Sequence, residues 1–117
     1  MFVVHLNAGT PSVHYNGVSS SNSYTAATSS ISADTWTHLA YVRNGTTWTW
    51  YINGVASGTG SETGADLSFT TEPTYVGYGG ESYFTPFNGY IDELRVTKGV
   101  ARYTSNFTAP TKAFANR

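Results

Sequence analysis

Hydrophobic and polar residues alternate along much of the chain in short runs, the pattern of β-strands with two different faces. Residues rich in Gly, Asn and Ser separate the runs, and helical signals are nearly absent apart from one turn's length within 98–107. The pattern predicts an all-β fold with strands every 8–12 residues, typical of an antiparallel sandwich. The runs rich in β-branched and aromatic residues lie at 2–7, 12–16, 37–44, 47–53, 67–70, 74–79 and 89–97.

The segments between these runs carry turn signals. Asn44-Gly45 and Asn53-Gly54 predict tight hairpins, because both central residues of a type I′ turn need positive φ. Residues 19–30 are small and polar, and read as a long loop or a weak edge strand. Residues 57–66 are expected to form a flexible connection.

The run 47–53 has two distinct faces, since neighbouring side chains of a strand point to opposite sides. Trp48, Trp50 and Ile52 share a wholly apolar face, which predicts that they point into the core. In 37–44 neither face is cleanly polar, so this strand is expected to be covered on both sides. The other face of 47–53 carries Thr47, Thr49, Tyr51 and Asn53.

Composition excludes several kinds of partner. Only 11% of the 117 residues are charged, the net charge is −1, and the six Lys and Arg are scattered. The chain therefore has no basic stripe for nucleic acid. No apolar run reaches the roughly 18 residues of a membrane span, and we expect no membrane partner. Cys is absent, and the N-terminal run is too short for a secretory signal.

Two blocks carry a resemblance to a known family. "WTHLAYVRNGTTWTWYINGV" (36–55), followed by "NGYIDELRVTKGVARYTSNFTAP" (88–110), resembles the laminin G-like, concanavalin A-like jelly rolls of phage and marine bacterial surface proteins. The resemblance implies an antiparallel jelly-roll sandwich of two sheets. It implies one domain over 1–117, with a sandwich core at 1–107 and a terminal arm at 108–117. An extracellular or virion-surface location is expected.

The chain departs from this family at its start, because the strands that usually precede the matched region are not in the sequence. Some sheet edge or core surface is then expected to lack its cover. Exposed strand edges pair with other chains. We therefore expect self-association through a sheet edge or face, most simply as a two-fold dimer.

The carboxylates do not form a glycosidase pair. Asp92 and Glu93 are adjacent in a predicted strand, so they point to opposite faces and cannot flank one sugar bond. We expect no enzymatic activity. Asp92 is interpreted as a buried acid that accepts backbone N–H bonds, and Glu93 with Arg95 as a surface pair on one face. Calcium is the one cofactor to consider, with Glu81 and Asp92 as candidate ligands, since Ca²⁺ prefers carboxylate and carbonyl oxygens.

The spacing of His5, His14 and His38 does not fit a zinc site, and we expect all three to be packed structural residues. Glycan recognition is the best active hypothesis, because sugars bind to aromatic rings with nearby amides and hydroxyls. Alternatively, the aromatic residues of the loop 78–88 cap the open end of the sandwich. The hypothesis predicts a recognition or adhesion module that binds glycans on a cell or particle surface. The alternative is a structural assembly module of a phage tail or virion with protein partners. The candidate glycan-binding residues are Tyr78, Glu81, Tyr83, Phe84 and Asn88 in the loop, with Tyr51 and Asn53 on the strand run.

Overall fold

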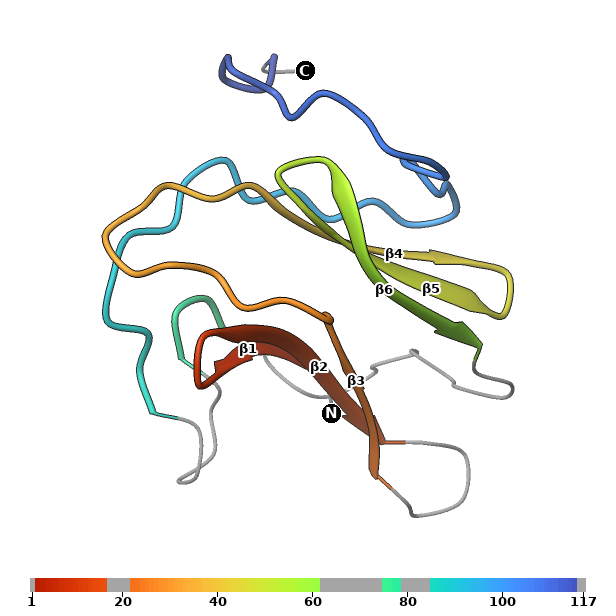
Figure 1. Ribbon diagram of the computed structural model, residues 1–117, viewed down its shortest axis with the longest axis horizontal. Helices are drawn as coiled ribbons and strands as arrows, with labels where there is room; N and C mark the ends of the chain where they lie inside the picture. The colour runs from red at the N-terminus through yellow and green to blue at the C-terminus, as the bar shows by residue number, and fades with distance from the viewer. Residues whose placement is uncertain (1, 17–21, 62–74, 79–84, 116–117) are drawn as a thin grey trace.

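The computed structural model describes residues 2–16, 22–61, 75–78 and 85–115, and shows two antiparallel three-stranded sheets (Figure 1). The described residues contain no helix, and therefore no apolar helix of membrane-spanning length. The predicted all-β sandwich is confirmed.

Sheet A comprises the first three strands, in the order β1-β2-β3. They span Phe2–Asn7, Thr10–Asn16 and Asn22–Ala26. Ala8 and Gly9 join β1 to β2 with φ values of +48° and +81°, which fits a type I′ hairpin turn. The predicted strands at 2–7 and 12–16 are confirmed, and β3 is the edge strand that was one reading of 19–30.

Sheet B comprises β4 (Leu39–Asn44), β5 (Thr47–Ile52) and β6 (Val55–Ser61), in that order. Asn53 and Gly54 turn with φ values of +49° and +82°, as predicted for a type I′ turn. The turn at Asn44-Gly45 was predicted incorrectly in detail. Asn44 ends β4, and Gly45 is the first central residue with φ +60°, the pattern of a type II′ turn.

The strand β6 lies where the sequence predicts a flexible connection. Its small residues hide the usual strand pattern, but they fit their partners on β5. Gly60 lies against the ring of Trp48, so closely that a Cβ at Gly60 would clash with that ring. Thr59 hydroxyl donates to the Trp48 carbonyl at 2.9 Å. A close approach between backbone and ring thus favours glycine here.

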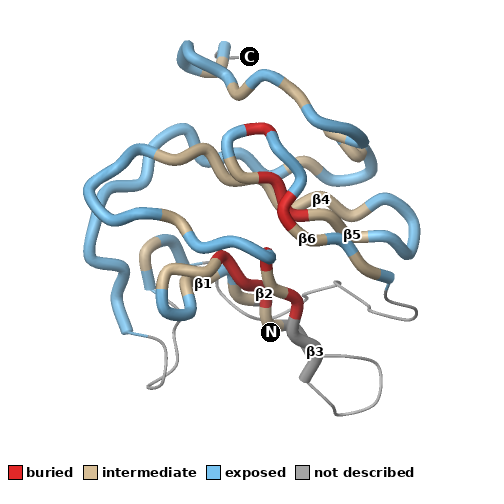
Figure 2. Tube along the Cα trace, in the orientation of Figure 1, coloured by how far each residue is buried: buried red, intermediate tan, exposed pale blue. Residues whose placement is uncertain are grey.

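The core lies between the two sheets, as the alternation of 47–53 predicts. Val13 of β2, Ala27 and Trp50 are buried, and Trp50 is only 1% exposed. Tyr41, Trp48 and Ile52 pack against them, and the buried stretches of both sheets face one another in Figure 2. The Thr25 hydroxyl also donates to the Tyr41 hydroxyl at 3.4 Å, which joins the sheets.

The chain after β6 runs differently from the prediction. The described residues of 75–115 contain no strand and no helical turn, so the strand predicted at 89–97 is wrong. The predicted strand at 67–70 lies outside the described residues, and 75–78, the described part of 74–79, is irregular. A strand needs a hydrogen-bonding partner as well as an alternating pattern. Glu93 moreover has φ +51°, which interrupts extended backbone.

Candidate functional site

The face of sheet B that points away from the core carries a row of small polar side chains. The register pairs Asn44 with Thr47, Val42 with Thr49 and Ala40 with Tyr51. Directly paired residues of antiparallel strands project to the same side. These residues therefore form one surface, which we call the outer face of sheet B.

The segment after residue 100 covers one end of this outer face. Tyr103 and Phe107 stack in parallel, with ring centroids 3.6 Å apart. The Phe107 ring also makes edge-to-face contacts with Tyr51 and His38, with ring centroids 5.4 Å and 5.6 Å apart. Tyr51 is consequently only 2% exposed. The prediction that the strand 37–44 is covered on both sides holds only near its start, where Phe107 packs on His38, because Asn44 at its end is exposed.

Two hydrogen bonds fix this covering segment to the β5–β6 hairpin. The Phe107 N–H donates to the Gly54 carbonyl at 2.9 Å. The Asn106 side-chain oxygen accepts a bond from the Ala56 N–H, also at 2.9 Å. The cover therefore holds a defined position on the sheet.

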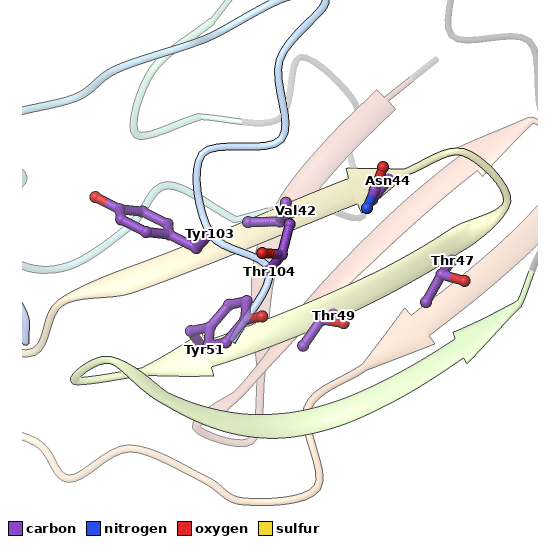
Figure 3. Close-up of a pocket in the computed structure, with 7 residues that line it drawn as sticks. All are labelled: Val42, Asn44, Thr47, Thr49, Tyr51, Tyr103 and Thr104. Carbon is purple, nitrogen blue, oxygen red and sulfur yellow. The ribbon is translucent and has the colours of Figure 1, made fainter. Parts of the chain in front are cut away.

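A shallow cleft of about 160 Å³ remains beside the cover, along β4 and β5 (Figure 3). Figure 3 shows Thr47, Thr49 and Tyr51 in a row on β5, with the other lining residues on β4 and on the covering segment. The described lining residues supply hydroxyls, one amide and aromatic carbon, and none of them is charged. Its residues are Val42, Asn44, Thr47, Thr49, Tyr51, Tyr103 and Thr104.

Comparison with known families identifies the superfamily of the chain. A laminin G family model, described as the concanavalin A-like lectin/glucanases superfamily, matches residues 1–102. The chain belongs to this superfamily. Searches of curated proteins and of solved structures find no match to the chain.

Within this superfamily sandwich, the candidate residues Tyr51 and Asn53 have structural contacts. Tyr51 lines the cleft, but its side chain is buried and cannot offer an exposed face for stacking. Asn53 sits in the turn after β5, where its side-chain oxygen accepts a bond from the His38 N–H at 2.9 Å. Its own N–H donates to the His38 carbonyl at 2.8 Å. Asn53 thus joins the end of β5 to the residue before β4, at the end of the hairpin opposite its turn.

The loop candidates lie in the irregular segment after β6. Tyr78 is 45% exposed and its ring meets that of Tyr75 edge-on at 5.8 Å. Asn88 is exposed and follows Phe87, whose N–H donates to the Gly77 carbonyl. Among the described residues, no hydrogen bond or ring contact joins these loop residues to Tyr51 or Asn53. The other loop candidates, Glu81, Tyr83 and Phe84, lie outside the described residues.

The predicted carboxylate roles are partly wrong. Asp92 is exposed rather than buried, although its Oδ1 does accept the Glu93 N–H at 2.8 Å. Glu93 accepts from the Phe114 N–H, while Arg95 lies 3.9 Å from the centre of the Phe114 ring and donates to the Tyr103 hydroxyl. Both side chains therefore hold the C-terminal segment instead of forming the predicted pair.

The calcium hypothesis stays a prediction, since Glu81 is not described. Among the described residues, no three His, Cys, Asp or Glu side chains gather as a metal site would require.

Several cleft residues were not predicted from the sequence. The alternation of 47–53 places Thr47 and Thr49 on the outer face, but nothing in it singles them out as site residues. Tyr103 and Thr104 lie more than 50 residues from β5 in the sequence. Their arrival on this face depends on how the chain folds back after β6, which a local pattern does not encode.

His38 lies under the covering segment in a partly desolvated position. Burial lowers the pKa of His38 below its ordinary value of 6.5, and the positive charge of Arg95 lowers it further. On sheet A, burial and then the charge of His14 lower the pKa of His5. Both imidazoles are therefore favoured in their neutral form.

We expect the stability of the protein to fall as the pH is lowered from 7.5 to 5. Because the pKa values of His5 and His38 are lower in the folded chain, the unfolded chain binds more protons once the pH drops to about 6.5. The stabilisation is complete above this pH and is lost progressively below it. Thermal melting across this range measures the effect, and His38→Gln should flatten it. A melting temperature that rises towards pH 5 would contradict the assignment.

Proposed function

We propose that this chain is a non-catalytic recognition module that binds an uncharged glycan in the cleft on the outer face of sheet B. The single observation that carries the proposal is the described lining of this cleft, which combines hydroxyls with an amide and includes no charged residue. Membership of a superfamily of lectins and glucanases supports a carbohydrate ligand. A cell or particle surface is the setting that such a module fits.

The chemistry of the cleft matches a neutral sugar. Asn44 offers an amide that donates and accepts, and Thr47 and Thr104 offer hydroxyls that do both. A sugar hydroxyl needs partners of this kind, whereas a charged ligand would need an opposite charge. The cleft is smaller than the roughly 300–1,000 Å³ of pockets for drug-sized ligands. We therefore infer that it holds one saccharide unit of a longer glycan.

The same lining argues for binding rather than hydrolysis. Glycosidases place two carboxyl groups about 5–10 Å apart around the bond they cleave. None of the described residues that line this cleft is Asp or Glu. A ligand seated there would meet no carboxyl group among these lining residues, and we expect it to leave unchanged.

The proposal is tested by screening a panel of neutral oligosaccharides and then measuring affinity for the best binder. Asn44→Ala and Thr47→Ala should each weaken binding roughly three- to tenfold, because each removes a hydrogen-bonding group from the cleft. Asn88→Ala and Thr108→Ala are matched controls, since both residues are exposed and neither lines the cleft. Their affinities should equal that of wild type.

Two outcomes would contradict the proposal, one for the site and one for the lack of catalysis. A loss of affinity in Asn88→Ala, with Asn44→Ala unaffected, would place the glycan at the loop 78–88 instead. Cleavage of any oligosaccharide in the panel would overturn the non-catalytic assignment.

A second candidate function is structural assembly with protein partners, as in a phage tail or virion. It is favoured by the exposed apolar side chains of the segment 90–100, where Tyr90 and Val96 are more than four-fifths exposed. An assembly module should lose its oligomers when this segment is charged, with no effect of sugar. A recognition module should bind sugar whether or not the segment is altered.

A further inference from the structure

The segment 90–100 has the composition of a strand but pairs with no strand in the described part of the chain. Among the described residues, its backbone makes no hydrogen bond to another backbone group. Tyr90, Leu94, Val96 and Val100 are 86%, 63%, 88% and 67% exposed. Apolar side chains next to unpaired N–H and C=O groups are the features by which one chain recruits another.

The even-numbered residues of this segment form a self-complementary series. In extended backbone they project to one side. The series reads apolar, acidic, apolar, apolar, basic, apolar, and all six residues are exposed. These residues are Tyr90, Asp92, Leu94, Val96, Lys98 and Val100.

An antiparallel copy of the same segment, centred on Arg95, satisfies the whole series. Tyr90 then lies opposite Val100 of the second copy, Asp92 opposite Lys98, and Leu94 opposite Val96. The two-fold axis repeats each pair. Apolar and oppositely charged cross-strand pairs stabilise antiparallel strands, and a two-fold contact requires this reciprocity. We propose that the segment 90–100 pairs with the same segment of a second chain, and so forms a two-fold dimer.

The odd-numbered side contains one unfavourable pair in this register, at Arg95. Arg95 falls opposite its own copy, where two like charges would repel. Its guanidinium is instead held back on the Phe114 ring and the Tyr103 hydroxyl of its own chain.

Pairing requires the backbone to straighten, notably at Glu93 and Gly99. Glu93 and Gly99 have φ values of +51° and +85° in the single chain. Gly99 accepts extended geometry as readily as its present one. For Glu93 the extended region is the more favourable one, so straightening relieves strain. We infer that the segment becomes a regular strand only when the second copy binds.

The experiment is sedimentation velocity on the full chain, from micromolar to near-millimolar concentration. Wild type should shift from a 12.6 kDa monomer towards twice that mass. Lys98→Asp places like charges opposite Asp92 at both ends of the interface. It should weaken the dimer about tenfold, as should Asp92→Lys. Lys112→Asp makes the same charge change at an exposed lysine outside the segment, and should leave the dimer intact.

The decisive experiment mixes two variant chains that carry opposite charge changes. An equimolar mixture of the Lys98→Asp and Asp92→Lys chains restores opposite charges at both positions, and should form a heterodimer about as tightly as wild type dimerises. Circular dichroism confirms that each variant is folded. A wild type that stays monomeric at every concentration would overturn the proposal, and would leave the segment to another protein or to no partner. A mixture that stays monomeric, or a dimer lost in Lys112→Asp, would overturn it as well.

Discussion

Replacing Trp50 with alanine should lower the free energy of unfolding by about 3–5 kcal/mol. The indole lies between the two sheets, is 1% exposed, and its ring centroid is 5.0 Å from that of Tyr41. Its removal leaves a cavity in the buried cluster that Trp50 forms with Val13 and Ala27. Urea or thermal unfolding of the variant measures the loss.

Trp36 provides the matched control, because it is 71% exposed. Trp36→Ala is expected to change the free energy of unfolding by less than about 0.5 kcal/mol, as is usual for surface substitutions. If Trp50→Ala melted within a degree or two of wild type, the assignment of Trp50 to the core would be wrong.

The second large effect is expected at Gly54, where alanine should cost about 2–5 kcal/mol. Gly54 has φ +82°, which disfavours any side chain. A Cβ there would also collide with the backbone carbonyl of Phe107, and overpacking of this kind typically costs a further 1–3 kcal/mol. The substitution should in addition displace the covering segment, because the Gly54 carbonyl accepts the Phe107 N–H. Thermal unfolding measures the loss of stability, and increased solvent exposure of Tyr51 reports the displacement of the covering segment.

Gly45 separates the two causes. It also has positive φ, at +60°, but a Cβ there would meet nothing within 4 Å. Gly45→Ala should therefore show the conformational cost alone, about 1–2 kcal/mol. Equal losses at Gly45 and Gly54 would mean that Phe107 does not press on the β5–β6 turn as described.

Local sequence pattern predicted the hairpins well. The strands β1, β2, β4 and β5 follow directly from alternation, and the turn at Asn53-Gly54 follows from the need for positive φ. The core position of Trp50 follows from the same alternation, because a wholly apolar strand face must be buried. These features depend on residues within a few positions of one another.

Features that depend on distant contacts were not predicted. β6 is a strand because Gly60 fits under the Trp48 ring, although glycine and serine carry little strand propensity. The run 89–97 has that propensity, yet finds no partner strand among the described residues. Tyr51 was expected to be open to a ligand and is instead covered by Tyr103 and Phe107. The covering segment also supplies two of the cleft residues, so the cleft depends on a contact between remote parts of the chain.

The most direct test of glycan binding in the cleft is an NMR titration of the isotope-labelled chain with a neutral oligosaccharide selected by the screen. The cleft on the outer face of sheet B predicts that shift changes concentrate on the amides of Asn44, Thr47, Thr49 and Thr104. Changes confined to 75–78 and 85–88, with those four amides unmoved, would contradict the cleft and place the ligand at the loop.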